Sequence, residues 1–116
     1  MSNYHEPIES LDEHTRNCTR AMNSLKEEIE AVDWYNQRVA ATKDENLKKI
    51  LAHNRDEEIE HAAMTLEWLR RNMDAWDEEL KTYLFTEEPI TEVEEISESE
   101  EDNSSKSDDL GIGNSK

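Results

Sequence analysis

Apolar residues recur at intervals of three and four along the first two thirds of the chain, a spacing that predicts long amphipathic helices. The first stripe begins near Glu9 and consists of Leu11, His14, Cys18, Ala21, Leu25, Glu28, Val32, Tyr35 and Val39. The second consists of Leu47, Leu51, Asn54, Glu58, His61, Thr65 and Trp68. Glu, Lys, Leu and Ala dominate these runs, and the chain has only two Gly and two Pro, so we predict an all-α fold.

A break at residues 41–45 separates the two long helices. Thr42 followed three residues later by Glu45 has the form of a capping box, so we expect Thr42 to open the second helix. A connection this short makes the two helices antiparallel neighbours. The second helix is expected to end near Arg71, with Asn72 suited to a left-handed cap.

The rest of the chain divides into shorter pieces. Residues 74–85 predict a third, shorter helix, and Pro89 interrupts it before a further turn or two with Ile90 and Val93. From Ser97 the residues are mainly Ser, Glu, Asp and Asn, which have little to bury, so a disordered acidic linker is expected. The predicted organisation is an arm at 1–8, a helical domain at 9–96, a linker at 97–109 and a docking peptide at 110–116.

Two carboxylates and an imidazole interrupt the apolar stripes. Glu58 and His61 are three residues apart on the second helix, which places them side by side, and Glu28 lies between Leu25 and Val32 on the first. Counted from the break, Glu28 and Glu58 both lie about fifteen residues away, so an antiparallel hairpin puts them at the same height. A solvated acidic face is the alternative, but the flanking apolar residues favour a metal site, and this ligand set suits iron or manganese.

The ligand set is half of a known arrangement. Carboxylate-bridged di-iron bundles take a Glu from each of two helices and a Glu-x-x-His from each of two others. One hairpin supplies one of each, so we expect a two-fold dimer, forming a four-helix bundle with the metals at its interface.

Length and charge limit the kinds of partner that this chain can bind. With 116 residues, about a third of them hydrophobic, the core is thin and a partner is expected to cover it. The net charge of −17 argues against binding nucleic acid or an anionic membrane and favours cations. Cys18 is the single cysteine, so it cannot form a disulfide within the chain. No apolar run is long enough to span a bilayer, and the first residues lack the pattern of a signal peptide, so we expect a cytoplasmic location.

Four segments of the chain resemble known proteins. Residues 27–41, 53–72 and 82–90 resemble the encapsulated ferritins of bacteria and archaea, and Leu110-Gly-Ile-Gly113 resembles the encapsulin-targeting peptide of their cargo proteins. The resemblance implies a ferritin-like bundle and a ferroxidase that oxidises Fe(II) to Fe(III) at a di-iron centre. It also implies a ring of five dimers inside a cytoplasmic encapsulin nanocompartment, whose shell stores the mineral.

The resemblance also implies roles for individual residues. It makes Glu28, Glu58 and His61 the ferroxidase ligands and places Trp34 and Tyr35 near them. Iron entry is implied at Glu27 and Glu30, an outer site at His53, Glu57 and Glu60, and shell docking at Leu110, Gly111, Ile112 and Gly113. From the residues alone, a solvated face explains the outer carboxylates better than an entry role does, and packing explains the tryptophans better than a redox role does.

A different class of function competes with oxidation. The same acidic helices and tail suit a non-catalytic adaptor or a metal-buffering cargo protein that binds cations and docks to a partner. Glu28 discriminates between the two, because an adaptor has no reason to bury a carboxylate on an apolar stripe.

Overall fold

The computed structural model describes residues 4–107, with the side chains of 4–101. Within that part of the chain there are four α-helices and no strands, which confirms the all-α prediction. The elements are a 3-10 turn η1 (Ile8–Ser10), α1 (Glu13–Ala41), α2 (Glu45–Asn72), α3 (Asp74–Tyr83) and α4 (Ile90–Ser107). The described residues form two compact units, which divide between Met73 and Asp74.

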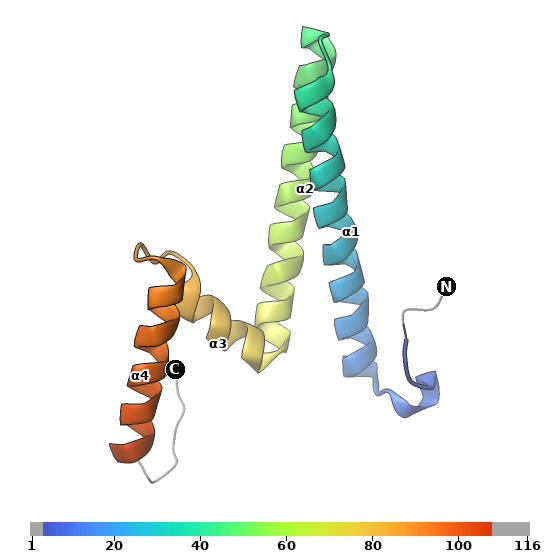
Figure 1. Cartoon of the computed structure of the whole chain (residues 1–116). Helices are drawn as coiled ribbons and strands as arrows, with labels where there is room; N and C mark the ends of the chain where they lie inside the picture. The colour runs from blue at the N-terminus through green and yellow to red at the C-terminus, as the bar shows by residue number, and fades with distance from the viewer. Residues whose placement is uncertain (1–3, 108–116) are drawn as a thin grey trace. The chain divides into compact units, whose positions relative to one another are not determined.

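The first unit is an antiparallel hairpin in which α1 and α2 lie side by side along their length (Figure 1). This confirms the predicted two-helix hairpin. The first helix was predicted to start near Glu9, but α1 starts at Glu13. The η1 turn occupies the residues before it, and Asp12 is its N-cap. The Asp12 Oδ1 atom accepts a hydrogen bond from the Thr15 N–H at 2.7 Å, which satisfies one of the first amide groups of the helix.

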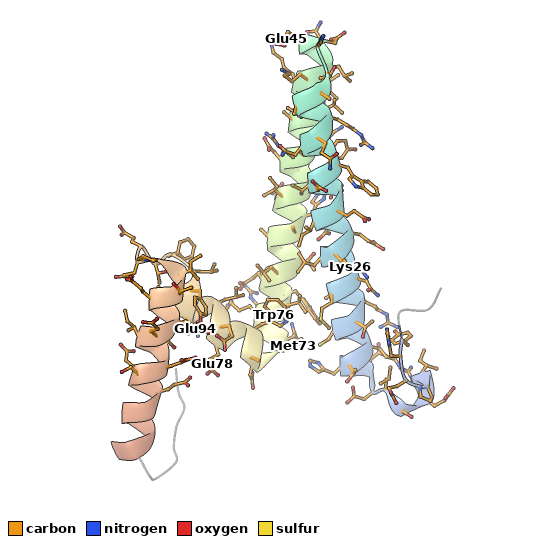
Figure 2. The ribbon with its side chains drawn as sticks, viewed as in Figure 1. Lys26, Glu45, Met73, Trp76, Glu78 and Glu94 are labelled. Carbon is orange, nitrogen blue, oxygen red and sulfur yellow. The ribbon has the colours of Figure 1, made fainter. Side chains whose placement is uncertain are left out.

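The closed end of the hairpin differs from the predicted capping box, and Glu45 marks it in Figure 2. Asp44, not Thr42, is the N-cap of α2, and its Oδ1 atom accepts from the Leu47 N–H at 2.9 Å. Thr42 instead caps the end of α1, and its hydroxyl oxygen accepts from the Asp44 N–H at 3.2 Å. A carboxylate is a stronger acceptor than a hydroxyl for a helix N-terminus, which explains the choice of Asp44.

The end of α2 was placed within one residue of its observed position, but its cap is different. The helix ends at Asn72, and the capping residue Met73 has extended backbone angles (φ −137°, ψ 111°). Asn72 therefore does not take the left-handed cap conformation. Its side-chain amide donates to the Trp68 carbonyl oxygen at 2.8 Å.

The second unit pairs α3 with α4. Val93 of α4 is buried, and Glu94 and Glu98 lie close enough to raise the pKa of Tyr83 on α3, second to the loss of solvent around that ring. The chain turns between the helices at Phe85, a non-glycine residue with a positive φ of 63° and a fully exposed ring. The predicted third helix therefore ends two residues early, at Tyr83.

The acidic segment after Ser97 was expected to be a disordered linker, but α4 continues through it to Ser107. The helix has already begun at Ile90 and packs at Val93, and adding residues to an existing helix is far easier than starting one. The rest of the predicted linker and the predicted docking peptide, with Leu110, Gly111, Ile112 and Gly113, lie outside the described residues.

Few side chains are fully enclosed. Among the described residues, the buried apolar side chains are Cys18, Leu69 and Val93. Many large apolar side chains stay exposed on the hairpin, among them Met22, Ile29, Trp34, Leu47, Ile50, Ile59, Met64 and Trp68. None of the described helices combines the length and apolar character needed to cross a bilayer.

Candidate metal centre

Glu58 and His61 lie one turn apart on α2 and contact each other. The Nδ1 atom of His61 is 3.4 Å from Oε1 of Glu58. Both side chains are partly exposed, His61 more than Glu58. A carboxylate beside an imidazole on one helix face presents one oxygen ligand and one nitrogen ligand to the same side, as the sequence predicted.

Glu28 supplies the most informative atom of the site. Glu28 is partly buried on α1, and its Oε1 atom is buried without a hydrogen-bond partner among the described residues. A buried acceptor without a partner is costly, and the cost is much larger for an ionised carboxylate. A cation or a donor from outside the chain would remove that cost, so the residue fits a metal site.

A single copy does not complete the centre. Across the described residues, no three His, Cys, Asp or Glu side chains are arranged to hold a metal ion. The structure brings Glu58 into contact with His61. It does not add Glu28 to form the three-ligand cluster that we expected within one hairpin. Sharing of the site between two copies stays a prediction.

The outer carboxylates lie on the solvent side of both helices. Glu27 and Glu30 flank Glu28 on α1, and Glu57 and Glu60 flank Glu58 on α2. All four are exposed, as is His53 one turn earlier on α2. This placement suits both the entry role that the family resemblance implies and an ordinary solvated face.

The aromatic pair after Glu28 divides between two environments. Trp34 is half exposed, whereas Tyr35 is partly buried and lies about two turns from Glu28 on the same stripe. The guanidinium carbon of Arg38 is 5.3 Å from the centre of the Tyr35 ring, which is within cation–π range. The three-residue spacing from Tyr35 to Arg38 is the signal that sequence analysis left unused.

Two further contacts near the candidate ligands were also missed. The Thr65 hydroxyl donates to the His61 carbonyl oxygen at 3.1 Å, which ties the turn after His61 together. An Nη1 atom of Arg55 donates to Oδ1 of Asn36 at 3.0 Å and so links α2 to α1. The stripes contained Thr65, but no sequence spacing indicates which residue of another helix a long arginine side chain reaches.

A separate ionic cluster closes the end of α2. The Glu67 carboxylate accepts hydrogen bonds from Arg70 at 2.8 Å and from Arg71 at 2.6 Å. These bonds, with the charges of the two guanidinium groups, lower the pKa of Glu67 to about 2. The cluster lies two turns beyond His61, so we do not assign it to the metal centre.

Comparisons with known proteins relate the chain to one family and one fold. The sequence model of the EncFtn-like family matches residues 3–87, which include α1, α2 and α3 and end before α4. A "Ferritin-like protein" of Thermotoga maritima is 63% identical over 109 residues, 94% of this chain and 94% of that protein. An "Encapsulated ferritin-like protein" of Rhodospirillum rubrum is 67% identical over 90 residues, 78% of this chain and 64% of that protein. The crystal structure of protein ne0167 from Nitrosomonas europaea matches with a TM-score of 0.74 and 63% identity, over 77% of this chain and 98% of that one.

Proposed function

The chain belongs to the EncFtn-like family of encapsulated ferritin-like proteins, and from that premise we propose that it is a ferroxidase whose di-iron site is shared by two copies. Family membership supports an iron-related, ferritin-like role. To this role our proposal adds the oxidation of Fe(II) to Fe(III), with oxygen as the electron acceptor.

The observation that carries the proposal is the buried Oε1 atom of Glu28, which has no partner among the described residues. A second copy related by a two-fold axis would bring a second Glu28, Glu58 and His61 to the same place. The carboxylates then neutralise the two iron ions that are oxidised, and each imidazole adds a nitrogen ligand. The contact between Glu58 and His61 holds the imidazole ring in one orientation on α2.

The residues around the centre take supporting roles in this proposal. Exposed Glu27 and Glu30 on one helix, and His53, Glu57 and Glu60 on the other, gather Fe(II) before it enters, because negative charge raises the local concentration of cations. Trp34 and Tyr35 border the centre. We further propose that five dimers form a ring inside an encapsulin nanocompartment in the cytoplasm, with Leu110 and Ile112 as the docking anchors.

Aerobic addition of Fe(II) tests the proposed activity. Glu28→Ala, Glu58→Ala and His61→Ala should each slow oxidation at least tenfold, because every change removes a ligand from both halves of the site. The growth of ferric absorption measures the rate. Glu13→Ala is the matched control, since it removes an exposed carboxylate from the same helix as Glu28.

The same experiment separates the competing function. A native chain that binds Fe(II) without oxidising it would support a metal-buffering cargo protein instead. Equal rates for the native chain, the three ligand variants and the control would remove the proposed centre altogether.

A further inference from the structure

We propose that Arg55 and Asn36 are positioning residues, whose hydrogen bond fixes the register of α1 against α2 and thereby the height of Glu28 relative to Glu58 and His61. The proposal rests on the proposed function, because a register matters only if these residues act together. The Arg55 Nη1 atom donates to the Asn36 Oδ1 atom at 3.0 Å, and the Arg55 Nε atom donates to Asp56 at 3.1 Å. The rigid guanidinium fork is therefore held by one acceptor on each helix.

Apolar packing alone sets this register weakly. In the described hairpin, the buried apolar side chains are Cys18 and Leu69, and both lie toward its open end. The middle of the hairpin packs through partly exposed residues that repeat at every turn. A repeating, loosely buried seam resists a slide poorly, whereas one polar pair that must meet its partner favours a single register, as a lone asparagine does in coiled coils.

The pair lies between the closed end of the hairpin and the candidate ligands. Glu28 is thirteen residues before Ala41, and Glu58 is thirteen residues after Glu45, so both lie about 20 Å from the closed end at 1.5 Å per residue. Asn36 is five residues from its end of the turn and Arg55 ten. Because side chains lean toward the start of their helix, the long Arg55 side chain reaches back toward the turn and closes that difference.

A slip of one turn would separate the ligands. Such a slip moves Glu28 about 5.4 Å along α2, whereas a bond from a ligand to a metal ion is only about 2 Å long. The pair therefore holds Glu28 level with Glu58 and His61 along the hairpin.

Anaerobic titration with Co(II) tests the proposal without requiring oxidation. Asn36→Leu and Arg55→Met should each weaken Co(II) binding about tenfold or more and alter its visible absorption, while the helix content stays unchanged. Asn36→Asp keeps an acceptor for Arg55 and should bind as the native chain does. The double variant should be no weaker than the worse single variant, because both changes break one bond.

The control is Gln37→Leu, since the Gln37 side chain donates within its own helix, to Asp33 at 3.2 Å. Native Co(II) affinity in both Asn36→Leu and Arg55→Met would overturn the positioning role and leave the proposed function standing. An equal loss in Gln37→Leu or in Asn36→Asp would also overturn it, since the effect would then belong to the helix face. A native chain that neither binds Co(II) nor oxidises Fe(II) would overturn the proposed function and this role with it.

Discussion

At the scale of single residues, Glu67 is the clearest case in which local contacts set chemistry. Its carboxylate accepts from Arg70 and Arg71 in the last turn of α2, and these bonds lower its pKa from an ordinary value of 4.5 to about 2. A depressed carboxyl pKa stabilises the fold above the unfolded value. That contribution is fully present above pH 4.5 and is lost as the pH falls from 4.5 toward 2.

We expect Glu67→Gln to remove this part of the acid sensitivity. The variant should melt at a lower temperature than the native chain at pH 7, because its amide cannot accept charge-assisted bonds from both arginines. The difference in melting temperature should shrink as the pH approaches 2, because the native carboxylate then becomes protonated and loses its charge. Melting curves followed by circular dichroism between pH 2 and 7 measure it, and a difference that is constant with pH would contradict the assignment.

Residues also differ in how far sequence could predict their roles. Glu28, Glu58 and His61 could be chosen because a polar group on an apolar stripe is costly unless it binds a partner. Arg55 could not, since it lies off the stripe and its partner Asn36 is on another helix. The second half of the proposed centre was inferred from the number of candidate ligands, because one chain supplies half of the set that a di-iron bundle uses.

At the scale of elements, the long stripes predicted α1 and α2, but the ends of the helices depended on local competition. Thr42 and Asp44 both suit a cap, and only the folded geometry selects Asp44. The acidic part of α4 was missed for another reason. Composition indicates what a segment can bury, whereas this segment is helical because it continues a helix that begins at Ile90.

The terminal peptide carries the prediction that belongs to this scale. Deleting residues 109–116 should abolish loading into a co-expressed encapsulin shell and leave the rate of iron oxidation unchanged, because the deletion removes Leu110 and Ile112 but no candidate ligand. Copurification of cargo with assembled shells measures loading. Leu110→Asn with Ile112→Asn should reproduce the loss and Asn114→Ala should not. Undiminished loading of the deleted chain would place the docking surface elsewhere.

At the scale of the whole molecule, a strongly acidic chain exposes a large apolar surface. The net charge is −17, while Ile29, Ile50 and Met64 are each more than half exposed. Association of two copies would bury such residues, but it would also bring carboxylates together across an interface of low dielectric constant. Bound metal cations would neutralise the repulsion between these carboxylates.

Assembly should therefore depend on metal. Native mass spectrometry should show mainly monomer without metal and dimers or larger rings once Fe(II) is added, because binding to the assembled form stabilises it. Glu28→Ala should associate more readily than the native chain in the absence of metal, since it lacks one of the repelling carboxylates, and Glu13→Ala should behave as the native chain. A native monomer that binds or oxidises iron normally would refute a shared centre.

The closed end of the hairpin also implies an order of folding. Contacts between α1 and α2 join residues ever farther apart in sequence from the turn toward the open end, and closing a longer loop costs more entropy. Asn36 and Arg55 are 19 residues apart, nearer in sequence than Glu28 is to either Glu58 or His61. We therefore expect the hairpin to form from its turn, so that Glu28 reaches the level of Glu58 and His61 only after the register has been set.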